Sequence, residues 1–319
     1  MTRSTIVVGD IGGTHARFAL AELSPGGRPT IGEMKRYRTR EHDGVASAWR
    51  AFERDSGGAL PDAASLGVAA PIDGDWILLV NSGWTIDRPA LIAELGLSRL
   101  ILHNDFGAVA FAVSVLEGDE LEQVTGPEGP LPGEGVTTVI GPGTGLGVSL
   151  LVRRRGRIDV IETEAGHTGF APMDGEAQAL ADDLAARYGR ASLERVVSGP
   201  GLIDLYRFLG GGEWDSRDPG GLWSAAIAGS DPIAAGALDR LVKWYGSAAG
   251  DMALAHGSTA VVLTGGLSNR IRDKLRSPLF RDGFTAKGRY RQRMDSVPVR
   301  LATYAEPGLL GAAVIFQRD

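Results

Sequence analysis

The stretch that decides the fold is VVGDIGGTHARFAL, residues 7–20, in which two apolar segments flank an aspartate, glycines and a threonine. The apolar segments predict two strands, over 4–10 and 16–23, joined by a tight turn. Such a turn is either a plain hairpin or a backbone cradle for phosphate, because glycine lets the main chain approach an anion closely. The rest of the chain has to decide between these interpretations.

The same pattern returns in TTVIGPGTGLGVSLLV, residues 137–152, which predicts a chain built from two duplicated halves. Strands alternate with helical segments elsewhere, as is typical of α/β proteins, whose ligands bind at the carboxyl ends of strands. A third glycine motif, 264–266, also follows an apolar strand. One such motif favours a plain turn, whereas three in one α/β chain favour phosphate binding. Asp43, Asp87 and Asp105 each precede helical patterns and are expected as N-caps.

Composition excludes several classes of protein. The chain has 319 residues, 43% hydrophobic and 23% charged, with a net charge of −6 and no cysteine. Disulfides and thiolate metal sites are therefore excluded. The charge provides no basic surface for nucleic acid or anionic lipid, and no apolar run is long enough for a membrane span. We expect a cytoplasmic protein with neither nucleic acid nor membrane as a partner.

The sequence contains no lysine-based phosphate motif. A Walker A motif is excluded because no glycine is followed by lysine, and no lysine occurs between Lys35 and Lys243. The glycines of GPGTGLG are spaced differently from a dinucleotide-binding G-x-G-x-x-G. Any phosphate is therefore expected to bind backbone N–H groups, the hydroxyls of Thr14 and Thr144, and Mg²⁺, with Asp10 suited to a metal-bound water.

Five motifs occur in order: GDIGGTHARFAL at 9–20, HNDFGAVAFA at 103–112, GPGTGLG at 141–147, EAGH at 164–167 and LTGG at 263–266. In these motifs the chain resembles the bacterial glucokinases of the hexokinase–actin–Hsp70 fold over essentially its whole length. The resemblance implies an α/β, two-domain actin-like or hexokinase-like ATPase fold with a duplicated, ribonuclease H-like sheet core. It implies a small domain of 1–108 plus 304–319, a large domain of 109–303, and a homodimer.

The resemblance also implies the reaction: transfer of the γ-phosphoryl group of MgATP to O6 of glucose in glycolysis, as two domains close around both substrates. Asp105 is implied as the catalytic base. The implied sugar ligands are Asn81, Asn104, Asp105, Glu164, His167 and Glu194. The implied ATP-binding residues are Asp10, Gly12, Gly13, Thr14, Gly143, Thr144, Gly265 and Gly266. No residue is expected to ligate the metal directly, and Asp10 is expected to act through a Mg²⁺-bound water.

Several alternatives remain at this point. Asp105 is also explained as a helix cap, a role that can coexist with that of a base, and on spacing alone Glu164 and His167 could equally belong to a solvated loop. His15 stands where the family usually has asparagine, and the chain lacks the cysteine-rich zinc motif of ROK-type sugar kinases. The function could instead be a kinase for another hexose (mannose, fructose or an amino sugar) or a non-catalytic sugar-binding regulator. Intact Asp10, Asp105 and glycine motifs speak against the regulator.

Overall fold

The computed structural model describes residues 4–80, 82–215 and 218–319. The chain divides into two compact units, Met1–Leu116 with Tyr304–Asp319 and Glu117–Thr303. The sequence placed this division at 108/109, but the first unit extends to Leu116. The reason is that helix α3 (Asp105–Val113) packs on helix α13 (Pro307–Arg318), so closely that a β-carbon at Gly311 would overlap the carbonyl of Ala108.

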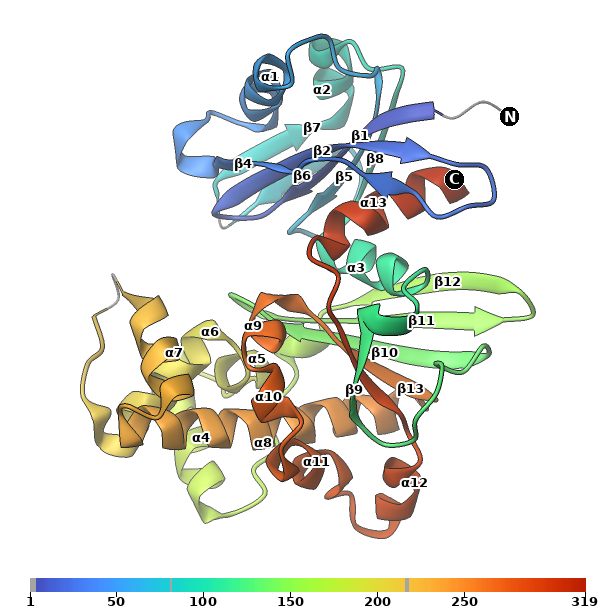
Figure 1. Ribbon diagram of the computed structural model, residues 1–319. Coiled ribbons are helices and arrows are strands. Elements are labelled where there is room, and N and C mark those ends of the chain that lie inside the picture. Colours follow the sequence, from blue (N-terminus) through green and yellow to red (C-terminus); the bar gives the residue numbers. More distant parts are fainter. Residues whose placement is uncertain (1–3, 81, 216–217) are drawn as a thin grey trace. The chain divides into compact units, whose positions relative to one another are not determined.

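The N-terminal unit is a sheet with helices on both faces (Figure 1). Besides α3 and α13, its elements are β1 (Ser4–Ile11), β2 (His15–Leu23), β3 (Thr30–Ile31), β4 (Lys35–Arg38), α1 (Val45–Asp55), β5 (Ala63–Val68), β6 (Trp76–Leu79), β7 (Trp84–Asp87), α2 (Arg88–Leu95) and β8 (Arg99–Asn104), with a 3₁₀ turn at Thr39–Glu41.

The strand order of this sheet is β3-β2-β1-β5-β8, and β4 also pairs with β2. Strands β1 and β2 are antiparallel, while β1, β5 and β8 are parallel. Because side chains alternate along β1, Val7 and Ile11 pack on the side of α1, whereas Ile6 and Val8 pack on α13. The central strand is therefore buried on both faces.

The C-terminal unit has more helices. Its strands are β9 (Leu121–Thr125), β10 (Gly135–Pro142), β11 (Leu146–Arg154), β12 (Arg157–Thr163), β13 (Ala260–Leu263) and β14 (Val299–Ala302). Its helices are α4 (Gly175–Tyr188), α5 (Leu193–Val196), α6 (Gly199–Tyr206), α7 (Pro219–Ala228), α8 (Pro232–Ala255), α9 (Gly265–Arg270), α10 (Arg272–Leu275), α11 (Pro278–Thr285) and α12 (Arg291–Asp295). Short helical turns lie at Gly118–Glu120, Ala165–His167, Arg207–Gly211 and Gly288–Tyr290.

This unit repeats the topology of the first. Its strand order is β12-β11-β10-β13-β14-β9, with β10 and β11 antiparallel and β10, β13 and β14 parallel. Helix α8 supplies much of the core, and Tyr245 at its centre is fully buried and donates its hydroxyl to the carbonyl of Ile140. The predicted α/β class and the duplicated sheet core are confirmed.

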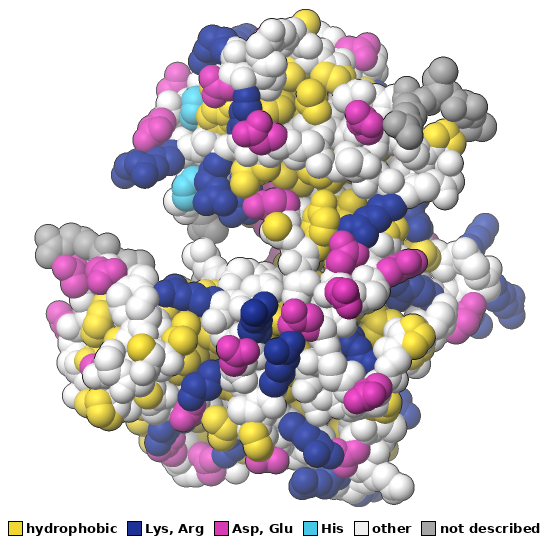
Figure 2. Space-filling model, viewed as in Figure 1, with side chains coloured by type: hydrophobic (Ala, Val, Ile, Leu, Met, Phe, Trp, Pro, Cys, Tyr) yellow, Lys and Arg dark blue, Asp and Glu magenta, His cyan; other side chains and the backbone are white. Residues whose placement is uncertain are grey.

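Local capping follows the sequence at some helices. Asp87 accepts the N–H of Ala90 at 3.1 Å as the N-cap of α2, and Gly96 ends that helix in the left-handed conformation. The expectation for α1 was wrong, because its N-cap is Gly44 rather than Asp43. In the described parts of the chain, no helix combines the length and the apolar character needed to cross a bilayer. Basic and acidic side chains are interspersed over the surface drawn in Figure 2.

Candidate active site

The first glycine motif forms the turn of the β1–β2 hairpin. The N–H of Gly12 donates to the carbonyl of His15 at 2.9 Å, which closes the turn around Gly13 and Thr14. Thr39 holds both carbonyls of the turn: its hydroxyl donates to Gly13 at 2.8 Å, and its N–H donates to Thr14 at 3.0 Å. Since a trans peptide is planar, the N–H of Thr14 points away from Thr39. The segment is thus a hairpin whose turn is hydrogen-bonded to Thr39 through both of its carbonyls.

Asp10 precedes this turn at the end of β1. Its Oδ2 accepts a hydrogen bond from Nη1 of Arg17 at 2.7 Å. Burial raises the pKa of nearby Glu306, an effect that Arg17 opposes and Asp10 reinforces. Mg²⁺ keeps several waters and is commonly held by one or two carboxylates together with substrate phosphates. A single carboxylate that is paired with a guanidinium group fits contact with a water bound to Mg²⁺ rather than direct contact with the ion. Within the described residues, no group of three or more acidic or histidine side chains could hold a metal ion.

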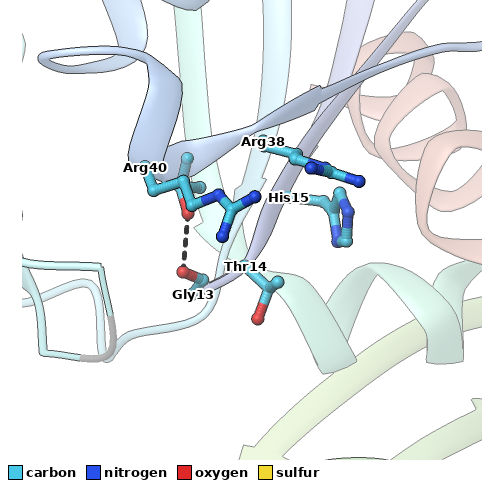
Figure 3. A pocket seen from close by; sticks show the side chains of 6 residues that line it. Gly13, Thr14, His15, Arg38 and Arg40 are labelled. Carbon is cyan, nitrogen blue, oxygen red and sulfur yellow. Dashed lines mark hydrogen bonds between the residues drawn. The ribbon is translucent and has the colours of Figure 1, made fainter. Parts of the chain in front are cut away.

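Two arginines that sequence analysis did not assign lie beside the turn. A cavity of about 420 Å³ is lined by Gly13, Thr14, His15, Arg38, Thr39 and Arg40. In Figure 3 the guanidinium group of Arg40 reaches toward Gly13 and Thr14, whereas that of Arg38 lies beside the ring of His15. Burial, reinforced by Arg36, Arg17 and Arg38, lowers the pKa of His15, so its imidazole is neutral at pH 7. The signal that could have revealed the arginines is RYRTR, 36–40, directly after the predicted hairpin.

The catalytic candidate lies where β8 ends and α3 begins. Sequence analysis left Asp105 open as the helix cap, but the structure gives that role to Asn104. The Oδ1 of Asn104 accepts the N–H groups of Phe106 at 2.9 Å and Gly107 at 3.0 Å. Asp105 is the first residue of α3, where the helix dipole favours a negative charge. Its half-buried side chain lies one residue after the N-cap, and its Oδ1 also accepts the N–H of Phe106, at 2.7 Å.

Directly before this pair, His103 is a buried residue of β8. Its Nδ1 lies 3.3 Å from the carbonyl of Asn104, and its Nε2 lies 3.1 Å from the hydroxyl of Ser65. A carbonyl only accepts, so Nδ1 carries the proton and Nε2 accepts from Ser65. Burial lowers the pKa of His103 to about 4, and the hydrogen bond to Asn104 opposes that shift. His103 is thus a neutral support beneath Asn104 and Asp105.

The second glycine motif is the β10–β11 turn of the C-terminal unit. The N–H of Gly143 donates to Gly145 at 2.7 Å, and the carbonyl of Gly143 accepts from Gly199 at 2.8 Å. Gly143 and Thr144 are exposed. The carboxylate of Glu194 accepts the N–H of Leu146 at 3.0 Å and lies so close that a β-carbon at Gly145 would overlap it. A sugar candidate and a phosphate candidate are therefore adjacent here.

The EAGH motif forms a 3₁₀ turn after β12. The N–H of His167 donates to the carbonyl of Glu164 at 3.0 Å, and the His167 Nε2 and Glu164 Oε2 atoms are 3.7 Å apart. Both side chains are more than 60% exposed, at 62% and 67%. A β-carbon at Gly166 would overlap the carbonyl of Leu146, so this turn packs against the residue that Glu194 also contacts. The EAGH turn and Glu194 thus both lie beside Leu146.

The third glycine motif joins β13 to α9. Gly265 has a φ of +89°, which only glycine adopts without strain, and Gly141 packs directly against Thr264. The Oγ1 of Thr264 is buried and has no hydrogen-bond partner among the described residues. Gly265 and Gly266 therefore lie next to the strand that leads into the Gly143–Gly145 turn.

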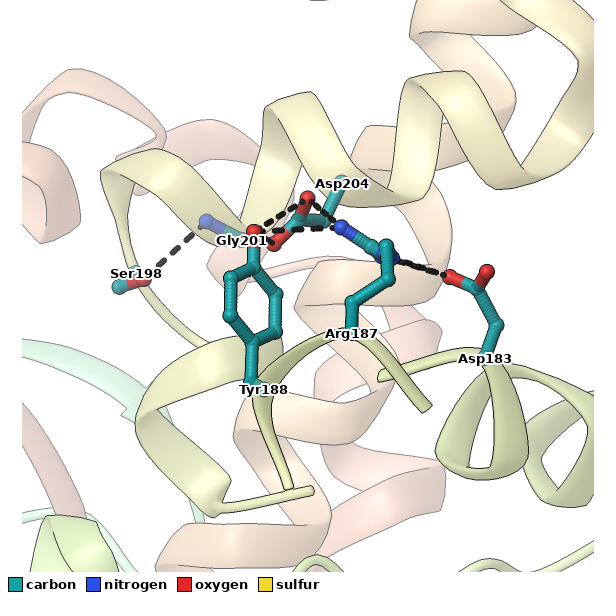
Figure 4. A network of polar contacts seen from close by, with 6 residues as sticks. All are labelled: Asp183, Arg187, Tyr188, Ser198, Gly201 and Asp204. Carbon is teal, nitrogen blue, oxygen red and sulfur yellow. Dashed lines mark hydrogen bonds and ion pairs between the residues drawn. The ribbon is translucent and has the colours of Figure 1, made fainter. Parts of the chain in front are cut away.

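An ionic network fixes the helices around the second turn. Arg187 on α4 pairs with Asp183 at 2.6 Å and with Asp204 on α6 at 2.6 Å, and Tyr188 donates to Asp204 at 3.2 Å (Figure 4). The Ser198 hydroxyl accepts the N–H of Gly201 at 3.1 Å as the N-cap of α6. Helix α6 begins at Gly199, whose N–H donates to Gly143. The cap at Ser198 and the ion pair at Asp204 therefore stabilise the helix that contacts the second glycine turn.

The predicted residues are thus divided between the units. Asp10, Gly12, Gly13, Thr14, Asn104 and Asp105 belong to the first unit, and Gly143, Thr144, Glu164, His167, Glu194, Gly265 and Gly266 to the second. Asn81 lies outside the described residues. In the first unit, the glycine turn and Asp105 follow β1 and β8, which run parallel through β5, so both lie at the same edge of one sheet.

The duplicated topology, with glycine turns at strand ends, defines the class of protein: a two-domain sugar kinase of the actin-like fold. The family model described as Glucokinase matches residues 7–319. A glucokinase from Zymomonas mobilis is 44% identical over 98% of this chain and 97% of its own. The chain belongs to the glucokinase family.

Solved structures of glucokinases have a similar fold. A glucokinase from an Antarctic psychrotroph has a TM-score of 0.83 and 30% identity, covering 99% of both chains. A ROK family glucokinase from Streptomyces griseus, solved with glucose and AMPPNP, has a TM-score of 0.65 and 21% identity, covering 98% of this chain and 99% of its own. The second likeness concerns the fold alone.

Proposed function

We propose that the chain is an ATP-dependent glucokinase, which transfers the γ-phosphoryl group of ATP to O6 of glucose and yields glucose 6-phosphate and ADP. The observation that carries the proposal is the position of Asp105, at the N-terminus of α3 and at the sheet edge that also holds the first glycine turn. Asn104 provides the N-cap of this helix, and the carboxylate of Asp105 accepts the N–H of Phe106 at 2.7 Å, which holds it at the start of α3.

In the proposed reaction, a bond forms between O6 of the sugar and the γ-phosphorus while the bond from that phosphorus to the β–γ bridging oxygen breaks. The O6 proton passes to the carboxylate of Asp105. The positive end of the α3 dipole stabilises the negative charge of that carboxylate. Phosphoryl transfer relies chiefly on positioning and electrostatics, so a weak base in the right place is sufficient.

The proposed sugar ligands are those that the resemblance implied. With its oxygen engaged in capping and its amide nitrogen donating to the carbonyl of Ala70 at 3.5 Å, Asn104 would offer its second amide N–H to a hydroxyl. Glu164, His167 and Glu194 supply acceptors and a donor from adjacent segments of the second unit. Asn81 completes the proposed set. Sites that read hydroxyls reject analogues that leave a buried polar group unpaired.

The proposed nucleotide ligands are the glycine turns, with Thr14 and Thr144. The Streptomyces griseus relative binds AMPPNP, an ATP analogue, which supports ATP as donor. Mg²⁺ bound with ATP would neutralise the charge that develops on its phosphates, and Asp10 would orient the water around the ion. We further propose a cytoplasmic role in glycolysis, where ATP is available, and a homodimer.

The test is a panel of sugars assayed with ATP and Mg²⁺ by coupled ADP release. We expect glucose to have the highest kcat/KM among glucose, mannose, fructose, glucosamine and N-acetylated amino sugars. A different sugar far ahead of glucose would replace the proposal with another hexose kinase. Tight sugar binding without ADP release would replace it with a regulator.

A further inference from the structure

The cavity beside the β1–β2 turn is lined by two arginine side chains as well as by the backbone of the turn. Arg38 and Arg40 flank Thr39, and Thr39 is the residue that hydrogen-bonds both carbonyls of the turn. The two arginines are therefore carried on a segment that is fixed to the glycine turn. In addition, Arg38 is paired in register with His15 across β2 and β4.

We propose that Arg38 and Arg40, together with the amide face of the Gly13–Thr14 turn and His15, form a binding site for a phosphate group. This site would supply the positive charge that the sequence, lacking lysine here, had left to Mg²⁺ alone. A guanidinium group presents a planar fork of donors that matches phosphate oxygens, so arginine suits this role better than lysine.

The burial and charge of these residues fit the proposal. The side chains of Arg38 and Arg40 are 57% and 75% exposed, so a phosphate can reach both without rearrangement of the core. His15 lies between the turn and Arg38 and can donate one hydrogen bond as a neutral imidazole.

Glu41 is the charge that opposes the site. Its Oε1 is 3.6 Å from Nη1 of Arg38 and 4.0 Å from Nε of Arg40. Exposed pairs at such distances contribute little to stability, so a phosphate dianion can displace them. Glu41 should therefore weaken phosphate binding, and its removal should strengthen it.

The phosphate could be the tail of the proposed ATP donor or a free anion, and the two sources share one chemistry. The first source rests on the proposed function, whereas the second does not. The proposal is that these arginines bind phosphate, and titrations with nucleotides and with free phosphates distinguish the two sources.

The experiment compares the full chain with Arg38→Gln, Arg40→Gln, Glu41→Gln and Arg54→Gln. Arg54, in the last turn of α1, is exposed and does not line the cavity, so it controls for the loss of one positive charge. Calorimetric titrations use AMPPNP, AMP, tripolyphosphate and inorganic phosphate. Kinetic assays give KM for ATP and for glucose separately.

With ATP as the source, we expect each pocket arginine variant to weaken AMPPNP binding about tenfold, because hydrogen bonds between charged groups are worth that much. Binding of AMP and the KM for glucose should be unchanged. With a free anion as the source, the variants should weaken only the binding of tripolyphosphate or inorganic phosphate. In either case Glu41→Gln should strengthen binding of the same titrant two- to threefold, by the size of an exposed pair.

The inference is overturned if no phosphate-containing titrant distinguishes the pocket variants from wild type, or if Arg54→Gln weakens binding equally. Glu41→Gln keeps the test decisive if an arginine variant fails to fold, since unchanged phosphate binding in that variant also overturns it. A wild-type chain that binds phosphate but does not phosphorylate glucose would refute the proposed function and leave this site in place.

Discussion

Protonation of His103 should destabilise the protein in acid. The imidazole is only 7% exposed, and its pKa falls from 6.5 to about 4 on folding because burial disfavours the charged form. The unfolded chain therefore binds a proton as the pH falls through about 6.5, while the native chain resists until about 4. Between these values the free energy of unfolding falls as the pH falls.

The size of the effect follows from the shift. A difference of about 2.5 pKa units at about 1.4 kcal/mol per unit gives about 3 kcal/mol lost between pH 6.5 and 4. Domains of ordinary stability have only about 5–15 kcal/mol in total, so the loss is large. It would act directly beneath Asn104 and Asp105, because His103 hydrogen-bonds the Asn104 carbonyl.

The assay is urea denaturation at several pH values between 7.5 and 4, for wild type and His103→Gln. Carboxylates titrate equally in both proteins, so the difference between their pH curves isolates His103. His256→Gln is the matched control, because burial also lowers the pKa of His256 but that side chain is less buried. Parallel curves for wild type and His103→Gln would refute the reasoning.

Three further predictions concern the catalytic and sugar residues. Asp105→Asn should retain glucose binding but lose about 10²–10⁴-fold in kcat, as expected for removal of a general base; near-normal kcat in steady-state assays would leave Asp105 a structural residue only. Glu164→Gln should raise KM for glucose more than KM for ATP, and an unchanged glucose KM would remove Glu164 from the sugar site. Gly145→Ala should displace the carboxylate of Glu194, since the new β-carbon would overlap it, and should raise KM for glucose. Glucose affinity equal to wild type in that variant would show that Glu194 does not need its bond to Leu146.

The sequence predicted the fold because its strands and turns are locally encoded. The two hairpins with their glycine turns identified the duplicated halves, and Asp87 with Gly96 marked both ends of α2. These features depend on residues next to each other in the chain. The expectation at Asp43 was wrong because three polar or small residues precede α1, and which of them becomes the N-cap depends on how the chain enters the helix.

The site was less predictable because it depends on pairing between distant segments. Asn104 rather than Asp105 is the N-cap because α3 begins one residue earlier than the sequence pattern indicated. Arg38 and Arg40 reach the glycine turn only because β4 pairs with β2 and Thr39 bonds to the turn. Glu194 meets Gly145 through a contact between residues far apart in sequence, which no local pattern encodes.

The most direct test of the central claim is the identity of the product. Wild-type protein incubated with ATP, Mg²⁺ and glucose should give glucose 6-phosphate and ADP in equal amounts by ³¹P nuclear magnetic resonance, and Asp105→Asn should give little of either in the same time. ATP hydrolysed to ADP and inorganic phosphate, or a sugar phosphorylated at another oxygen, would contradict the account.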